Sequence, residues 1–384
     1  MELTKCKLGE LITQRREKND GLDLPICGVS KDGLIPPKQK DADTSIYNVF
    51  YRDDFIFNPA RMELNSIAIN DMYDRAICSS LYEVFYVHRT DLLLPHYLEL
   101  IIRQKWFTRY CEFLGQGSAR EYCRFGNISE IEIEFPPIEE QQKIVEYNTA
   151  IENRIALKQK INDNLVAVGT ASIQKNVGRG ALINLTEAEM DSLIFPEDFK
   201  IKTVSEFCAE TKSGSTPSRT NNEYWENGTI SWVKSGEVHN NITLQTEEYI
   251  TSLGLSESST KLLPKDTVLM AMYGVTAGEV GYLAIEATTN QAICGMICRS
   301  KAEAAYLYFS LIQSQAAISR LSNGGAQDNL SKNFIDNIKI VVPLSEFIEK
   351  LNLATIVEQM TLNTKEITLL KELQATVLAQ LSSR

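Results

Sequence analysis

Apolar residues occupy every second position along residues 131–135 and residues 338–342, and a period of two is typical of β-strands. The apolar positions are Ile131, Ile133 and Phe135 in one segment and Ile338, Ile340 and Val342 in the other. A proline ends each strand, and acidic residues follow it, which favour the first turn of a helix because that end carries partial positive charge. Each segment therefore predicts a strand that leads into a helix.

Beyond each proline, apolar residues recur at alternating spacings of three and four, which is the heptad pattern of a coiled coil. In the first helix the seam positions are Ile144, Tyr147, Ile151, Arg154, Lys158, Ile161, Leu165 and Val168. In the second helix they are Leu353, Ile356, Met360, Asn363, Ile367, Leu370, Gln374, Val377 and Leu381. We expect an antiparallel coiled coil whose polar seam residues help to fix the register. Two separate amphipathic helices, each lying on its own domain, are the alternative.

The two strand segments belong to a longer internal repeat. The stretch GSAREYCRFGNISEIEIEFP matches GGAQDNLSKNFIDNIKIVVP, so that Ile133 aligns with Ile340. Further upstream, KLGELI at Lys7 matches TVSEFC at Thr203. A repeat of about 200 residues is too long for a solenoid and indicates that a whole domain with its trailing helix is duplicated.

We therefore expect two copies of an α/β (α+β) domain, joined by two long helices. The expected boundaries are 1–136 for the first domain, 137–178 for the central helix and linker, 179–342 for the second domain and 343–384 for the distal helix. The small, polar stretch GTASIQKNVGRG, Gly169–Gly180, is expected to be the linker.

Composition narrows the function classes. The net charge of −11 argues against a general nucleic-acid coat, but it leaves room for a local basic face. Residues 101–127 provide such a region, with Arg103, Lys105, Arg109, Arg120 and Arg124 against Glu112 and Glu121. The eight cysteines form no Cys-x-x-Cys pair, and only three histidines exist, so we expect no metal and a reducing, cytoplasmic location. We expect neither a signal peptide nor a membrane span.

Chemical motifs are missing. We find no phosphate-binding glycine loop, no nucleophile elbow and no zinc-protease motif. The nearest match to an amino-methyltransferase motif is Asn58-Pro59-Ala60-Arg61, which lacks the second proline and the aromatic residue. A long chain without such motifs favours binding over catalysis, and we expect no catalytic residues and no cofactor.

An ordered set of segments carries a resemblance over nearly the whole chain. GSTPSRTNNEYWENGTISWVKSGEV, LLPKDTVLMAMYG, GEVGYL, TNQAICG and the terminal strand segment, followed by a long helix, resemble the specificity subunit of Type I DNA restriction–modification systems. The first half matches less sharply, through YNVFYRDDFIFNPARM, SSLYEVFYV, GQGSAREY and FPPIEEQQKIV.

The resemblance implies a non-catalytic subunit with two target-recognition domains, each recognising one half of a split sequence in double-stranded DNA. It also implies that the helices form a spacer on which methyltransferase subunits, two in number, and restriction subunits assemble. Those partners would carry adenine methylation and ATP-dependent cleavage. The second helix start, at Glu346, Phe347 and Ile348, departs from the Glu-Gln-Gln of the first, so its docking geometry is the less secure.

Polar loops are the candidate DNA contacts. In the second domain, Tyr224, Trp225 and Trp232 are expected to anchor a loop that presents hydroxyls and free backbone amides to phosphates, with arginine near a phosphate or guanine edge. The candidates are Ser213, Ser215, Thr216, Ser218, Arg219 and Lys234. For the hydroxyls and Arg219, a purely structural loop is an equal alternative.

The loops before the terminal strands supply further candidates, because glutamine and asparagine can contact adenine and arginine can contact guanine. They are Gln116, Ser118, Arg120 and Glu121 in the first copy and Gln327, Asp328, Asn329, Ser331 and Lys332 in the second. A solvated turn is the alternative at each loop. Two other functions stay open for the whole chain: a protein-only coiled-coil adaptor, or a stand-alone DNA methyltransferase with an unrecognised site.

Overall fold

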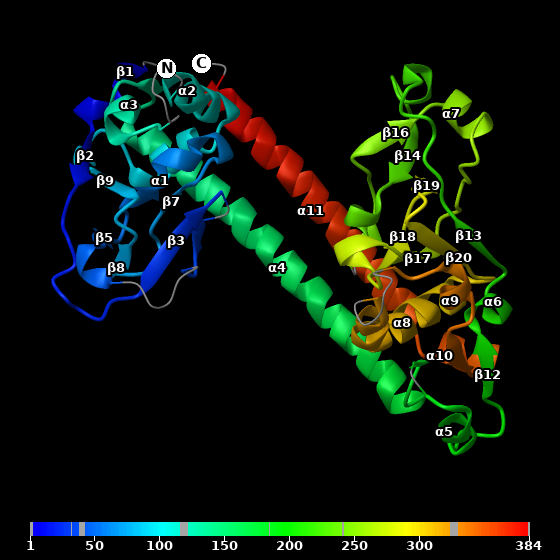
Figure 1. Cartoon of the computed structure of the whole chain (residues 1–384). Coiled ribbons are helices and arrows are strands. Elements are labelled where there is room, and N and C mark those ends of the chain that lie inside the picture. The colour runs from blue at the N-terminus through cyan, green and yellow to red at the C-terminus, as the bar shows by residue number, and fades with distance from the viewer. Residues whose placement is uncertain are drawn as a thin grey trace. The chain divides into compact units, whose positions relative to one another are not determined.

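The computed structural model of the chain describes residues 3–31, 33–37, 43–115, 122–183, 185–239, 242–322 and 329–382. The chain divides into two compact units, of which the first consists of residues 1–154 and 370–384 and the second of residues 155–369 (Figure 1). The long helices α4 (Ile138–Asn176) and α11 (Leu353–Ser382) contribute residues to both units. No helix within the described ranges is long and apolar enough to cross a membrane.

Two four-stranded sheets form the body of the first unit. One is antiparallel with the order β2-β9-β6-β7, and the other has the order β4-β3-β8-β5 with β3 and β8 parallel. A separate antiparallel pair joins β1 to β10. The strands are β1 (Thr4–Lys7), β2 (Ile12–Arg15), β3 (Ile26–Ser30), β4 (Gly33–Ile35), β5 (Asn48–Tyr51), β6 (Phe55–Phe57), β7 (Ile67–Ile69), β8 (Arg75–Cys78), β9 (Glu83–Val87) and β10 (Glu132–Phe135).

Strand β6 separates two apolar cores, because its alternate residues face opposite sides. Phe55 and Phe57 enter a core built with the helices α1 (Pro95–Ile102), α2 (Lys105–Gly115) and α3 (Phe125–Ser129). Ile56 enters a smaller core that contains residues of the second sheet. Phe55 stacks on Phe85 of β9 with ring centres 4.9 Å apart. A strand that is buried on both faces explains the continuous apolar run Phe-Ile-Phe.

A buried ion pair ties β2 to the turn before β6. The carboxylate of Asp54, whose side chain is 2% exposed, accepts hydrogen bonds from Arg15 Nε at 2.6 Å and Nη2 at 3.0 Å. It also accepts the backbone N–H of Tyr51 at 2.7 Å. Burial raises the pKa of Asp54, against the effect of its hydrogen-bond donors. The guanidinium of Arg15 lies against the rings of Tyr51 and Tyr86, so the pair is packed as well as bonded.

The described residues of the second unit form three sheets. The largest has the order β13-β20-β17-β18-β15, beside a sheet with the order β16-β14-β19 and another with the order β11-β21-β12. The strands are β11 (Ala181–Leu182), β12 (Lys200–Thr203), β13 (Glu210–Ser213), β14 (Ile230–Val233), β15 (Ile242–Thr243), β16 (Glu248–Ile250), β17 (Thr267–Ala271), β18 (Val280–Leu283), β19 (Thr288–Thr289), β20 (Ile293–Ile297) and β21 (Lys339–Val342).

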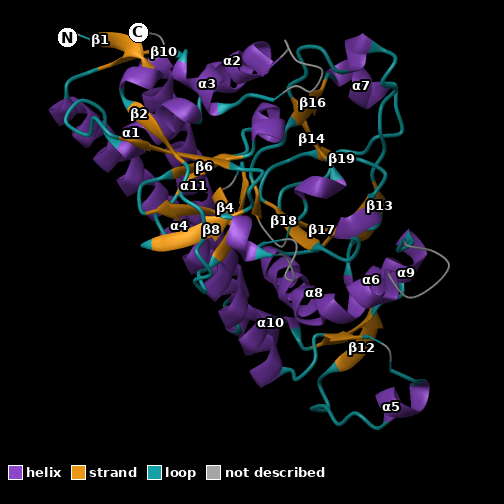
Figure 2. Ribbon diagram, turned by 60° about the vertical axis from the view of Figure 1, so that its left-hand side comes forward, coloured by secondary structure: helices purple, strands orange, loops and turns teal. Residues whose placement is uncertain are grey.

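Helix α8 packs on the five-stranded sheet of this unit (Figure 2). Its residues Tyr306, Tyr308 and Phe309 are fully buried in a core to which α4 adds Ile173 and α11 adds Val357. Both long helices are therefore part of the second core. The helices of this unit, besides α4 and α11, are α5 (Glu187–Asp191), α6 (Val204–Phe207), α7 (Ser252–Ser256), α8 (Lys301–Ser322), α9 (Lys332–Asp336) and α10 (Ser345–Lys350).

The internal repeat is confirmed by strand pairing. In the first unit β1 pairs with β10 in antiparallel register, and Lys7 lies opposite Glu132. In the second unit β12 pairs with β21 in the same way, and Thr203 lies opposite Lys339. The same short helix, α3 or α9, precedes the last strand of each pair. Two segments of different sequence thus form the same arrangement of strands and helix, as the duplicated strand-and-helix pattern predicts.

The predicted helix pair is confirmed, and polar contacts join α4 to α11 within each unit. In the first unit, Gln374 Nε2 donates to Asn148 Oδ1 at 3.0 Å. In the second, Asn363 Nδ2 donates to Asn162 Oδ1 at 2.9 Å. The residue numbers rise along one helix as they fall along the other, so the helices are antiparallel. Asn363 is 1% exposed and also accepts a hydrogen bond from Lys158.

The predicted seam is correct for the described part of α11 and only partly correct for α4, where Lys158 contacts Asn363 as expected but three other predicted positions are exposed. Tyr147 and Val168 are 66% and 56% exposed, and Arg154 is also exposed. The buried positions include Asn148 instead, and Asn162 faces the partner helix. Counting apolar residues misses these two asparagines because their amides find polar partners across the seam. The predicted seam residue Leu381 has a side chain outside the described part of the chain.

Two helix boundaries also differ from expectation. Helix α4 continues to Asn176, so most of the expected linker is helical. Gly169 is needed there, because a Cβ at this position would lie 2.3 Å from the ring of Phe309. The second long helix does not begin directly after β21. The short helix α10 comes first, and Asn352, in the left-handed region with φ of 54°, separates it from α11.

Candidate nucleic-acid interface

The loop that follows β13 is folded tightly onto the second unit. Gly214 begins it, and a Cβ at this position would lie 2.2 Å from the carbonyl oxygen of Asn290, so only glycine fits. The backbone N–H of Gly214 donates to Ile293 O at 3.1 Å, and that of Ser215 to Thr289 O at 2.9 Å. The expectation of free amides at the start of this loop was therefore wrong, because the sheet edge takes them up.

The hydroxyls of the loop have partners within the same unit. Ser215 Oγ lies 2.7 Å from Ser259 Oγ, and Ser218 Oγ lies 2.8 Å from Thr220 Oγ1. Thr216 Oγ1 donates to Gln291 Oε1 at 2.5 Å. Ser213 is the last residue of β13 and is half-buried. A hydroxyl can accept a second hydrogen bond or exchange its partner, so these contacts are compatible with phosphate binding.

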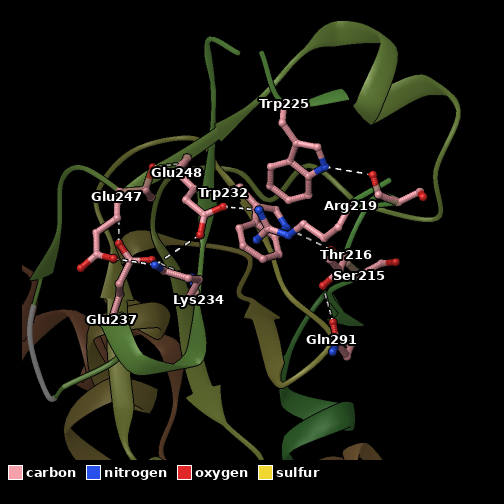
Figure 3. A network of polar contacts seen from close by, with 12 residues as sticks. Ser215, Thr216, Arg219, Trp225, Trp232, Lys234, Glu237, Glu247, Glu248 and Gln291 are labelled. Atoms are coloured by element: carbon pink, nitrogen blue, oxygen red, sulfur yellow. Dashed lines mark hydrogen bonds and ion pairs between the residues drawn. The ribbon is translucent and has the colours of Figure 1, made fainter. Parts of the chain in front are cut away.

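Arg219 packs against two indole rings that also contact each other (Figure 3). Its guanidinium carbon lies 3.6 Å from the ring centre of Trp225 and 4.8 Å from that of Trp232. Its Nη1 donates to Glu248 Oε2 at 2.5 Å. This hydrogen bond is the main reason that the pKa of Glu248 lies below its ordinary value. Stacking, charge and hydrogen bonding thus define one position for the guanidinium.

The aromatic residues anchor the loop, as the sequence predicts. Trp232 is 2% exposed, and its Nε1 donates to Ser215 O at 3.0 Å. Trp225 Nε1 donates to Ser218 O at 3.0 Å, and Tyr224 donates its hydroxyl to Glu257. The two indoles meet edge to face with centres 5.0 Å apart. Two of the three tryptophans therefore clamp both ends of the short polar loop.

Lys234 extends the charged network from β14. Its Nζ lies 2.5 Å from Glu247 Oε2 and 3.3 Å from Glu248 Oε1 (Figure 3). Hydrogen bonding to Glu247 is the main cause that raises the pKa of Lys234. Its backbone N–H donates to Glu237 Oε2 at 2.7 Å. Two cations here face three carboxylates, so the cluster is not a basic surface in this conformation. Sequence reasoning missed the carboxylates, which lie far from Arg219 along the chain.

The candidates near the terminal strand fall into two groups. Ser331 caps α9 by accepting the N–H of Phe334, and Lys332 Nζ binds Asp336 and Thr211 at 2.5 and 2.7 Å. Asn329 is exposed beside Tyr273, with which it forms a β-bridge. The remaining candidates lie outside the described residues: Gln116, Ser118, Arg120, Glu121, Gln327 and Asp328. The whole set stays a prediction.

The chain is similar to known proteins of one family. The model of the Type I restriction modification DNA specificity domain matches residues 10–167 and 196–377. The chain is 26% identical over 175 residues to the EcoR124I/EcoR124II specificity subunit of Escherichia coli, covering 44% of this chain and 41% of that protein. It is 22% identical over 322 residues to the HindI specificity subunit of Haemophilus influenzae, covering 67% of this chain and 70% of that protein.

A solved structure has the same fold. The crystal structure of a Type I restriction–modification S subunit from M. genitalium covers 99% of this chain and 96% of its own, with a TM-score of 0.58 at 16% identity. Fold and repeat together define a class of proteins with two mixed α/β domains that long helices join. The chain belongs to the Type I restriction–modification DNA specificity family. It is a specificity subunit, which recognises a DNA target and is not itself an enzyme.

Proposed function

We propose that this chain recognises a bipartite target in double-stranded DNA. Residues 1–136 are the first recognition domain and residues 179–342 the second. Each domain binds one of the two short base sequences that make up the target, and we call each of these sequences a block. The observation that carries the proposal is that the family match and the strand pairing both occur twice along the chain, in the same two regions. The family model matches the chain twice, at 10–167 and 196–377, and the strand pairs β1–β10 and β12–β21 repeat one register.

We propose further that residues 137–178 and 343–384 are the segments on which two methyltransferase subunits and the restriction subunits assemble. The exposed apolar side chains of the long helices support this, because Leu157, Leu362 and Leu369 are 54%, 61% and 55% exposed. A cytoplasmic location is consistent with eight cysteines that are all free thiols. In such a complex, S-adenosylmethionine, ATP and magnesium belong to the partners.

Reconstitution tests this assignment. The full chain is purified with tagged methyltransferase subunits, and native mass spectrometry gives the ratio, which we expect to be one to two. The complex should methylate one split sequence and leave DNA without it unmodified. An assembled complex without sequence preference would instead favour the adaptor. Binding of S-adenosylmethionine by the isolated chain would favour the stand-alone methyltransferase.

The asparagine of the Asn58-Pro59 motif has a structural role that argues against that last alternative. Asn58 Oδ1 accepts the backbone N–H of Ala60 at 3.1 Å and caps the 3-10 helix Pro59–Leu64. A methyltransferase motif would use this oxygen to accept a hydrogen bond from the target amine. Here the oxygen caps the helix, and Pro59 occupies the first helical position, where its missing N–H costs no hydrogen bond, so the pair forms an ordinary helix start.

A further inference from the structure

The first unit contains a cleft of about 1500 Å³ that sequence reasoning did not identify. The hairpin of β3 and β4 forms one side, and the 3-10 helix Pro59–Leu64 and the segment between β8 and β9 contribute further lining residues. Pockets for small molecules are mostly apolar and measure about 300–1,000 Å³. This cleft is larger, and many of its lining residues are charged or carry hydroxyls or amides. Its size favours a macromolecular ligand.

Basic side chains are in excess around the cleft. Lys31, Arg61, Arg103 and Arg124 line it, against the carboxylates of Glu63 and Glu83. This balance is opposite in sign to that of the whole chain, whose net charge is −11. A local basic surface on an acidic protein is the electrostatic pattern of a polyanion site.

Three of these cations are available to a ligand. Neither Lys31 nor Arg61 forms a side-chain ion pair or hydrogen bond with any residue in the described ranges. The side chain of Arg124 is 64% exposed and reaches Glu83 at 3.3 Å. Glu83 also accepts the backbone N–H of Phe125 at 2.7 Å, so it keeps a donor if Arg124 moves to a ligand. Arg103 differs, because Glu99 binds it at 2.5 Å.

The backbone brings Arg61 and Arg124 to one rim. The N–H of Cys123, next to Arg124, donates to the carbonyl oxygen of Pro59 at 3.0 Å. Arg61 interrupts the 3-10 helix with φ of −140° and ψ of 28°, and Asn65 ends it in the left-handed region. The two guanidinium groups therefore come from segments that a buried hydrogen bond joins, although they are distant in sequence. Side chains that the backbone holds at fixed positions in this way are suited to contact phosphates and to fix the register of a protein on DNA.

The cleft also corresponds in topology to the loop described above for the second unit. The order β4-β3-β8 in the first unit repeats as β16-β14-β19 in the second, with the same parallel and antiparallel pairings. Ser79 and Ser80 follow β8 as Asn290 and Gln291 follow β19. Gln291 is the partner of Thr216 in the predicted DNA loop. The segments that follow the equivalent strands β8 and β19 thus contribute to both sites.

We propose that this cleft is the DNA-contact surface of the first domain, a proposal that rests on the function proposed above. Lys31, Arg61 and Arg124 bind phosphates of the first half-site, and the hydroxyls of Ser79 and Ser80 face base edges. The occupant is a duplex, because phosphates spaced along a backbone match cations spaced along a rim. The phosphate contacts supply affinity, and the serine contacts supply sequence preference.

The test measures salt dependence with the whole complex. The full chain, assembled with its methyltransferase subunits, is titrated with a duplex that carries its methylation target at several salt concentrations. The slope of log K against log [salt] is negative, and each lost phosphate contact decreases its magnitude by about 0.9. We expect a decrease of about one for Arg61→Ala and about two for Arg61→Ala with Arg124→Ala. Arg61→Lys should keep the slope of the wild-type complex.

Arg52→Ala is the matched control. Arg52 is a half-exposed arginine of the same unit, it pairs with Asp74 at 2.9 Å, and it does not line the cleft. If the double variant keeps the slope of the Arg52→Ala complex, the cleft proposal is overturned while the proposed function stands. If the wild-type complex shows no preference for its target, the proposed function itself fails. Ser79→Ala with Ser80→Ala should relax one block of the methylated sequence, and a change in the other block would contradict the assignment.

Discussion

The guanidinium carbon of Arg219 lies 3.6 Å from the ring centre of Trp225. Glu248 binds the same guanidinium, and Trp232 lies on it as well, so a surface loop has one well-defined arginine at its centre. Cation–π contacts are strongest for tryptophan, and a planar guanidinium can stack and form hydrogen bonds at once. We call the contacts of Arg219 with Trp225, Trp232 and Glu248 the clamp. We infer that the clamp orders residues 214–232, whether or not Arg219 itself contacts DNA.

Removal of the clamp should therefore destabilise the second unit. We expect Arg219→Ala to lower the free energy of unfolding by about 1–2 kcal/mol, from a lost cation–π contact and a lost ion pair. Urea unfolding followed by tryptophan fluorescence measures it. Arg219→Lys should recover only part, because an ammonium group does not stack. Arg320→Ala, an exposed change on α8 in the same unit, serves as control and should have little effect. Equal unfolding curves for both alanine variants would contradict the clamp.

The clamp also predicts a dependence on pH. The hydrogen bond from Arg219 holds the pKa of Glu248 below its ordinary value of 4.5. A carboxylate of this kind stabilises the fold above its unfolded pKa and loses that contribution as the pH falls through its folded pKa. The difference in free energy of unfolding between wild type and Glu248→Gln should be full above about pH 5 and shrink below about pH 4. A difference that grows on acidification would contradict the sign of the shift.

In the first unit, the pair of Arg15 and Asp54 should be worth more than surface ion pairs. Asp54→Ala leaves a half-buried guanidinium without its carboxylate, and loss of one partner of a buried pair costs about 3–5 kcal/mol. Asp74→Ala removes a carboxylate that is 94% exposed from its pair with Arg52, and we expect less than about 1 kcal/mol. Chemical denaturation of both variants tests the contrast. Similar losses would show that the buried pair contributes no more than an exposed one.

The polar contact between Asn162 and Asn363 gives a prediction for the helix pair. Asn363→Leu leaves the Asn162 amide and Lys158 without one of their partners, which should cost about 1–3 kcal/mol. Asn162→Leu with Asn363→Leu removes both amides and should restore part of the loss. A double-mutant cycle on the free energy of unfolding measures the coupling between the two residues. Additive effects would contradict a direct role for the hydrogen bond.

Periodicity and repetition predict the architecture of this chain well, because they report which faces are buried. Ile133 and Ile340 lie in equivalent strands, and the seam of α11 from Leu353 to Val377 is as predicted. The predicted seam of α4 is wrong at Tyr147. Asn148 is buried instead, and its side chain forms a hydrogen bond with Gln374. Heptad counting weighs hydrophobicity and has no access to partners that lie more than 200 residues away.

The candidate site was less predictable for the same reason. Composition and loop position indicate Arg219 and Lys234, but the carboxylates that neutralise them come from around β16. The basic cleft combines Arg61 with Arg124, which meet only because Cys123 binds the carbonyl oxygen of Pro59. The local excess of basic residues at 101–127 was a partial signal, since it contains Arg103 and Arg124. Such sites depend on tertiary hydrogen bonds between distant segments, so the sequence shows no periodic pattern that would identify them.

Adenine methylation across a genome tests the central claim most directly. Long-read sequencing compares cells that express the methyltransferase subunits with the wild-type chain, without it, or with residues 179–342 replaced by the equivalent domain of a relative. We expect one split motif that disappears without the chain and changes in a single block after the replacement. A methylation pattern that is the same with and without the chain, or a replacement that alters both blocks, would contradict the account.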